Sequence, residues 1–481
     1  MESSIQAKIS HLPVLCDDKD ASTEVVAMVS LQAPFVDLKD IDKEPLRIVA
    51  VIDVSKSMED GKLDLVKASL GFILEQLSAK DSLGIVKFGS EVDRVLSLTK
   101  MDNRGKQKAR NVLSMIRESG STNLSGGLIE GLKMIQKSIE KSDVPQRHTL
   151  MLFTDGAANR GICDSSELKR VALSFVKDKD DLYQIFTFGY GMDHNPTMLN
   201  DIKNVGGCGD YYYIKNHESI GTCFAECLGG LLSLVAQNAT ITLLPQKGVK
   251  ICKVWGYTSD YWENKEHPTF ILGDLYSEQQ KDILCKMVVE PIKLETESSR
   301  DLLKCNISFF DLIEQKMNER EHTLSLPCYE KEITLNPVVC IQLHRVITAE
   351  AMQMALEISE TNLHHARSIL MGTIEFLTKE NIEGDDLTPL LIQDLKKCLN
   401  NMRNRQNYLQ IGRGDLFSLS FSHANQRSSV YTTSLQSDMI EKILDSEEYQ
   451  NAASIASDAL TTSNGLKPNN IGSLSLSTYY T

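Results

Sequence analysis

The sequence of 481 residues lacks several features that mark whole classes of protein. It has no run of lysine and arginine, and its net charge is −14. A nucleic-acid-binding protein needs a basic patch, so that class is not indicated. No apolar stretch approaches the roughly 18 residues that cross a bilayer, and the richest, residues 223–236, predicts a buried helix. Residues 1–4 show no basic flank before an apolar stretch, so we expect no secretory signal.

The cysteines form no pattern of their own. There are eleven, scattered and without a CxxC pair. Cys223 and Cys227 lie four residues apart, but no second pair or nearby histidine completes a zinc site. They predict reduced, buried thiols in a cytoplasmic protein. Phosphate-binding loops and the GxSxG motif are absent as well, so we expect no catalytic residues and no enzyme.

Strands and helices alternate from residue 47 to residue 236. The run "RIVAVID" is continuously apolar, as is "HTLMLFT", and such runs are typical of strands buried on both faces of a parallel sheet. The stretch "KLDLVKASLGFILEQL" has apolar residues at helical spacing, and a third buried strand reads "YQIFTFGY". This alternation predicts a doubly wound, Rossmann-like α/β domain over residues 47–236.

The regions on either side of this domain show different patterns of apolar and polar residues. Residues 1–46 show no helical spacing, and "STEVVAMVSLQAP" predicts a strand, whereas residues 237–345 contain short apolar segments separated by polar turns, including "EITLNPVVCIQL", and predict a β-sandwich. Helical spacing returns over residues 346–412, where two arms joined across Gly384 predict a helical hairpin. Residues 413–481 are rich in serine and poor in apolar periodicity, so we expect a partly disordered tail with one short helix at "DMIEKIL".

Small polar side chains follow the predicted buried strands. Asp53, Ser55 and Ser57 come directly after the first strand, Thr122 precedes a predicted helix, and Asp155 follows another buried strand. The carboxyl ends of strands in an open α/β sheet are where ligands bind, so these oxygens should meet. Hydroxyl and carboxylate oxygens suit Mg²⁺, and also Mn²⁺ or Ca²⁺. With only two carboxylates, such a metal would stay electrophilic and accept a further carboxylate from a partner.

These residues match a known pattern. Asp53-Val54-Ser55-Lys56-Ser57, Thr122 in "STNLSGG" and Asp155 in "TDG" resemble the metal-ion-dependent adhesion site of von Willebrand factor A (VWA) domains. The resemblance covers about residues 47–236. It implies that Ser55, Ser57 and Thr122 are hydroxyl ligands. It also implies that Asp53 and Asp155 bind the metal directly or through water.

A second resemblance covers the rest of the chain. Segments 270–289 and 420–431 resemble the regions that follow the VWA domain in plant ubiquitin ligases of the wavy-growth type. Those ligases carry a Cys/His-rich RING before the VWA domain, whereas residues 1–46 here contain only Cys16 and His11 of those types. The resemblance implies an architecture in which residues 1–46 and 237–345 form one sandwich with the VWA domain inserted. It does not imply ligase activity.

We therefore expect a non-enzymatic, cytoplasmic protein-interaction module whose metal receives an acidic residue from a protein partner. Asn123 begins a glycosylation sequon beside Thr122, and a glycan there would obstruct the site. One alternative is an extracellular or matrix adhesion protein with a VWA domain. Another is a component of ubiquitin ligation that has no RING. Nothing in the sequence predicts an oligomeric state.

Overall fold

The computed structural model describes most of the chain, in two compact units. One is Met1–Lys43 with Glu226–Ser437, here called the sandwich unit; the other is Glu44–Ala225 with Asp438–Thr481, here called the α/β unit. The described residues are 5–12, 22–36, 44–142, 146–156, 158–176, 182–191, 194–206, 209–214, 218–257, 259, 262–263, 265–290, 299–327, 336–379, 382, 384–426 and 432–463.

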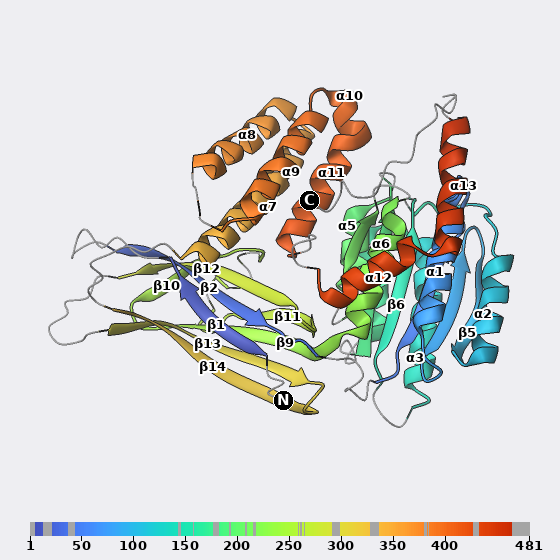
Figure 1. Ribbon diagram of the computed structural model, residues 1–481, viewed down its shortest axis with the longest axis horizontal. Coiled ribbons are helices and arrows are strands. Elements are labelled where there is room, and N and C mark those ends of the chain that lie inside the picture. Colours follow the sequence, from blue (N-terminus) through green and yellow to red (C-terminus); the bar gives the residue numbers. More distant parts are fainter. Residues whose placement is uncertain are drawn as a thin grey trace. The chain divides into compact units, whose positions relative to one another are not determined.

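A six-stranded sheet forms the centre of the α/β unit (Figure 1). Its strands are β3 (Arg47–Asp53), β4 (Ser82–Phe88), β5 (Val92–Lys100), β6 (His148–Thr154), β7 (Tyr183–Tyr190) and β8 (Tyr211–Ile214). They lie in the order β5-β4-β3-β6-β7-β8, and every pair is parallel except β4 with β5. The crossover from β3 to β6 separates two outward-growing halves, so the prediction of a doubly wound fold is confirmed.

Helices cover both faces of this sheet. They are η2 (Lys56–Met58), α1 (Lys62–Gln76), α2 (Asn103–Met115), α3 (Leu124–Ile139), α4 (Ser165–Val176), α5 (Pro196–Lys203) and α6 (Glu218–Leu232). Helix α3 lies against β3 and β4 and beside α4, which in turn contacts α5. The buried helix predicted over residues 223–236 corresponds to α6, which ends at Leu232, because Leu234 and Val235 already belong to the next strand.

The strands β6, β7 and β8 share an aromatic core with α6. Phe153, Phe188 and Tyr212 stand opposite one another in the ladder, so their side chains lie on the same face of the sheet. The Phe188 ring centroid lies 4.7 Å from that of Phe153, 4.9 Å from that of Tyr212 and 5.0 Å from that of Phe224 on α6. This cluster fixes α6 against the sheet.

The C-terminal region differs from the expected tail. Residues 413–463 form α11 (Arg413–Ala424), α12 (Ser434–Leu444) and α13 (Glu447–Ser463), and the α/β unit includes α13. Serine is a weak helix former, so sequence pattern alone favoured a loop, but burial of a few side chains decides the structure. On α13 these are Tyr449, Ala452 and Ala456, spaced so that they share one helix face. The expected disorder of residues 464–481 falls outside the described residues.

Helix α13 fits closely against Gly61, which precedes α1, and Gly221 of α6. A Cβ atom on Gly61 would lie 2.5 Å from Cβ of Ala456, and one on Gly221 would lie 2.5 Å from Cζ of Tyr449. The Tyr449 hydroxyl accepts a hydrogen bond of 2.7 Å from the Gly221 backbone N–H. A side chain at Gly61 would meet the backbone of α13, whereas one at Gly221 would displace the Tyr449 ring.

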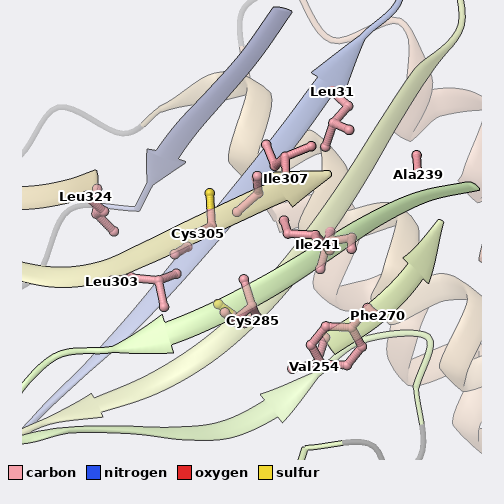
Figure 2. Close-up of a cluster of buried hydrophobic side chains, with 14 of the residues drawn as sticks. Leu31, Ala239, Ile241, Val254, Phe270, Cys285, Leu303, Cys305, Ile307 and Leu324 are labelled. Carbon is pink, nitrogen blue, oxygen red and sulfur yellow. The ribbon is translucent and has the colours of Figure 1, made fainter. Parts of the chain in front are cut away.

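The sandwich unit contains two antiparallel sheets. The first has the order β1 (Gln6–His11), β2 (Thr23–Gln32), β12 (Gln280–Val289) and β10 (Val249–Val254). The second has the order β11 (Thr269–Tyr276), β9 (Leu234–Pro245), β13 (Ser299–Asp311) and β14 (Lys316–Pro327). Side chains of both sheets form one core, in which Leu31, Ile241, Phe270, Cys285 and Ile307 meet (Figure 2). The segments 1–46 and 237–345 thus supply strands to one sandwich.

Strand β2 shows why its sequence is so apolar. Val25, Ala27, Val29 and Leu31 point into the sandwich, while Met28 faces outward against Val339 and Val346. Both faces of the strand are therefore covered. Strand β14, by contrast, was not predicted: it is an edge strand with the polar sequence "KMNEREHTLSLP", and charged edges of this kind discourage aggregation.

The helical region begins earlier than predicted and has more helices. Its members are α7 (Pro337–Ser359), α8 (Leu363–Lys379), α9 (Leu387–Asn401), α10 (Arg405–Asn407) and the π-helix η5 (Tyr408–Gly412), followed by α11. The segment "NPVVCIQL", expected as a strand, starts α7, because Asn336 caps the helix and Pro337 occupies its first turn. The first predicted arm is broken between Ser359 and Leu363, so three long helices replace the hairpin. No helix among the described residues has the length and apolarity of a membrane span.

Candidate metal centre

Two neighbouring strand ends form the floor of the candidate site. Strand β3 ends at Asp53 and β6 ends at Thr154, and the register pairs Ile52 with Phe153, so these ends are adjacent. The Thr154 hydroxyl donates a hydrogen bond of 2.6 Å to Asp53 Oδ2. Asp155 follows directly and is buried, as is Asp53. The two carboxylates therefore converge at one edge of the sheet.

The loop after β3 brings the two serines to these carboxylates. The backbone N–H of Ser55 donates to Asp53 Oδ1 at 2.8 Å, which turns the chain sharply before η2. The hydroxyl oxygens of Ser55 and Ser57 lie 3.1 Å apart, and the Ser57 hydroxyl donates to Asp155 Oδ1 at 2.6 Å. Ser57 is exposed whereas Ser55 is buried, so the site opens to solvent at Ser57.

Thr122 reaches the same place from a third loop. Its backbone N–H donates to the Asn159 side chain at 2.9 Å, and the Gly120 carbonyl accepts a bond of 3.1 Å from the Lys56 N–H. A Cβ atom on Gly156 would lie 3.1 Å from Thr122 Oγ1 and 3.6 Å from Ser57 Oγ. The two hydroxyls therefore flank the same small space. The structure brings together all five side chains that the sequence singled out.

Three residues that hold this arrangement were not predicted. Thr154 and Asn159 orient Asp53 and Thr122, and Lys62 donates through Nζ to Asp155 Oδ2 and, at 2.9 Å, to the Ser57 carbonyl oxygen. Thr154 stands in the "TDG" motif and could have been found from the pairing of the two strand ends. Lys62 and Asn159 act through contacts across loops, for which the sequence carries no periodic signal.

Burial sets the electrostatics of the site. It raises the pKa of the Asp53 carboxyl to about 6, and the nearby Asp155 charge raises it further, while hydrogen bonds from Ser55 and Thr154 oppose the shift. At neutral pH the carboxylate is ionised but poorly solvated. A cation placed between Asp53 and Asp155 would relieve that cost.

The donor set fits a hard divalent cation. It offers two carboxylates, three hydroxyls and no nitrogen or sulfur, which matches the preference of Mg²⁺, Mn²⁺ and Ca²⁺ for oxygen. The described residues contain no group of three or more His, Cys, Asp or Glu side chains arranged to hold a metal, so a metal at this site would rely on the hydroxyls beside its two carboxylates. Asp53, Ser55, Ser57, Thr122 and Asp155 are thus the residues that would hold one.

A comparison with known families agrees with this geometry. Residues 48–226 match the family model of the von Willebrand factor type A domain. The chain carries a VWA domain. VWA domains are in general protein–protein interaction modules and commonly bind a divalent metal at their adhesion site.

Curated relatives share this domain within longer proteins. Inter-alpha-trypsin inhibitor heavy chain H1 of Bos taurus is 28% identical over 192 residues, 39% of this chain and 21% of that protein. Heavy chain H3 of Homo sapiens is 30% identical over 161 residues, 33% of this chain and 18% of that protein. E3 ubiquitin-protein ligase WAV3 of Arabidopsis thaliana is 24% identical over 256 residues, 51% of this chain and 31% of that protein. The chain spans at most a third of the length of these relatives.

Two solved structures resemble the chain well beyond the VWA domain. A von Willebrand factor type A protein from Catenulispora acidiphila has a TM-score of 0.63 over 87% of this chain and 96% of its own. The ArnB paralog VWA2 from Sulfolobus acidocaldarius has a TM-score of 0.53 over 88% of this chain and 98% of its own. Both are 15% identical, so they show the fold alone.

Proposed function

We propose that the VWA domain binds a protein partner through a divalent metal, Mg²⁺ in the first place, held by Asp53, Ser55, Ser57, Thr122 and Asp155. The convergence of these five side chains, with Ser57 open to solvent, is the observation that carries the proposal. Bound there, the metal supplies an electrophilic position for an oxygen ligand. Three of the five candidate ligands are neutral hydroxyls, so the metal stays electrophilic and an Asp or Glu side chain of the partner completes the coordination.

The same geometry argues against a catalytic step. The Ser57 hydroxyl donates to Asp155, and the Ser55 hydroxyl is hydrogen bonded to Ser57, so among the described residues both hydroxyls are engaged within the site and not with a histidine base. His194 follows β7 and is buried, and its Nε2 lies 2.7 Å from the hydroxyl oxygen of Tyr211. We therefore propose a binding function without chemistry.

The first experiment measures metal binding directly. Titration calorimetry of the full chain with Mg²⁺ and Mn²⁺ should give one site, and Ser55→Ala should weaken it about tenfold or more, because a ligand is lost. Asp53→Ala combined with Ser55→Ala should remove it. Ser114→Ala, an exposed serine of α2, is the matched control and should leave binding unchanged.

Partner binding is then tested by capture from cell lysate. Proteins retained by the wild type in Mg²⁺ should be lost in a chelator and with the Asp53→Ala and Ser55→Ala double variant. If the double variant retains both the metal and the same partners as the wild type, the proposed function is wrong.

We also propose a cytoplasmic location. The described cysteines form no disulfide with one another, and Cys227, Cys285, Cys305, Cys340 and Cys398 are buried. The Asn123 side chain caps α3 by accepting from the Gly126 N–H at 3.1 Å, so a glycan on it would disturb both the helix and the site. Fractionation of expressing cells should find the chain, unglycosylated, in the cytosol. Recovery from the medium with a glycan would instead favour the extracellular adhesion alternative.

A role in ubiquitin ligation is the second candidate. The match to WAV3 spans 256 residues, more than the VWA domain alone, so the likeness includes part of the flanking regions. The described residues contain no Cys/His cluster of the kind that binds the zinc of a RING. An autoubiquitination assay of the purified chain separates the candidates, since activity without an added ligase would overturn the non-enzymatic proposal.

A further inference from the structure

A lysine lies in direct contact with the candidate metal ligands. Lys62 is the first residue of α1, and its Nζ donates to Asp155 Oδ2 and to the carbonyl oxygen of Ser57. The Asp155 side chain is 1% exposed and that of Lys62 is 28% exposed. A partly buried ion pair of this kind is screened much less by salt than a surface pair.

The position of this ammonium group is fixed from both sides. Its two acceptors belong to the loop after β3 and to the residue after β6, so it bridges the two segments that supply four of the five candidate ligands. Gly61 precedes it in a left-handed conformation with φ of 85°, against Ala456 of α13. The start of α1, and with it Lys62, is therefore held in place.

Lys62 changes the charge of the site. When ionised, Asp53 and Asp155 contribute −2, the three hydroxyls contribute nothing, and Lys62 contributes +1. The ligand set with its lysine thus has a charge of −1, and a divalent metal brings it to +1. Without Lys62 the same metal would be neutralised. The remaining positive charge is what one carboxylate from outside would cancel.

We propose that Lys62 sets the balance between metal and acidic ligand: it weakens binding of the metal alone and strengthens binding of a carboxylate to the metal-loaded site. This inference rests on the proposed function. The ammonium group repels the metal, and a bound acidic group offsets that repulsion, so the metal is held best when an acidic group is bound. This coupling between the metal and the acidic ligand is assigned to one lysine. Lys62 is a positioning residue that acts through charge and does not itself bind the metal.

The test measures Mn²⁺ affinity by electron paramagnetic resonance in the full chain, with and without acetate as the carboxylate probe. Lys62→Gln keeps a hydrogen-bond donor for Asp155 but removes the charge, and should bind Mn²⁺ alone about five- to tenfold more tightly than wild type. Acetate should tighten Mn²⁺ binding in the wild type and do so at least about twofold less in the variant.

Two controls separate charge from structure. Lys62→Arg keeps the charge and should behave as wild type, whereas Lys56→Met removes an exposed charge from the same loop and should change the affinity less than about twofold, because solvent screens it. If Lys62→Gln does not fold, Lys62→Met is used in its place, and the expected change in Mn²⁺ affinity is the same.

The possible failures are distinguishable. If wild type binds no more Mn²⁺ than the Asp53→Ala and Ser55→Ala double variant, the proposed function itself is wrong. If wild type binds Mn²⁺ but Lys62→Gln binds it equally or more weakly, the role of Lys62 is purely structural and this inference is overturned while the metal site stands.

Discussion

Replacing Gly61 by alanine is expected to lower the free energy of unfolding of the α/β unit by about 2–6 kcal/mol. Gly61 has φ of 85°, where an alanine costs about 1–3 kcal/mol in backbone strain. Its Cβ would also lie 2.5 Å from Cβ and 2.6 Å from Cα of Ala456. The second of these is backbone, so no side-chain rotation relieves the clash, and overpacking adds about 1–3 kcal/mol.

Amide hydrogen exchange in β3 and β6, measured at increasing denaturant concentration, gives this loss in the free energy of unfolding. The amides of α13 around Ala456 should exchange faster as well, because the helix must move away from α1. Gly191→Ala is the matched control: its φ is 64° and a Cβ there meets no atom of the described residues within 4 Å, so only the backbone strain lowers its stability. Equal destabilisation by Gly61→Ala and Gly191→Ala would show that the contact with α13 contributes nothing.

Phe188→Ala should be comparably damaging, lowering the free energy of unfolding by about 3–5 kcal/mol. The Phe188 side chain is fully buried and its ring contacts those of Phe153, Tyr212 and Phe224. Truncation would leave a cavity in the middle of this cluster, and stacked pairs add about 0.5–1.5 kcal/mol beyond the buried area.

Denaturant midpoints of Phe188→Ala, Phe188→Leu and wild type give the measurement. Phe188→Leu fills most of the cavity and should lose less than half as much stability as Phe188→Ala. Leu173→Ala, on the exposed side of α4, is a control for loss of an apolar side chain without a cavity. A loss below about 1 kcal/mol for Phe188→Ala would mean that the cluster repacks and does not anchor α6.

The candidate site was largely visible in the sequence because its residues follow strands that are easy to recognise. "RIVAVID" and "HTLMLFT" are buried on both faces, and residues at their carboxyl ends must lie at one edge of a parallel sheet. Thr122 was found because it precedes a helix with a clear start at Asn123. Periodicity and capping are local properties, so the sequence predicts them well.

The predictions that failed depended on contacts made far along the chain. The segment after Asn336 is apolar enough for either a strand or a helix, and packing of Val339 and Val346 against Met28 accompanies the helix. Helix α13 is rich in alanine and serine and has a narrow apolar face. That face is buried because it packs against Gly61 and Gly221. Neither partner is near in sequence.

The sequence alone therefore predicted the doubly wound sheet and singled out the five oxygen-bearing side chains of the candidate site, since each rests on a local pattern of apolar and polar residues, while the split sandwich was implied by the resemblance to the wavy-growth ligases. The tertiary structure decided that α13 returns to the VWA domain and that Lys62 places a positive charge against Asp155. Both features depend on contacts between side chains that are distant in sequence. These contacts are stabilised by burial and short-range electrostatics, which do not produce a periodic pattern in the sequence.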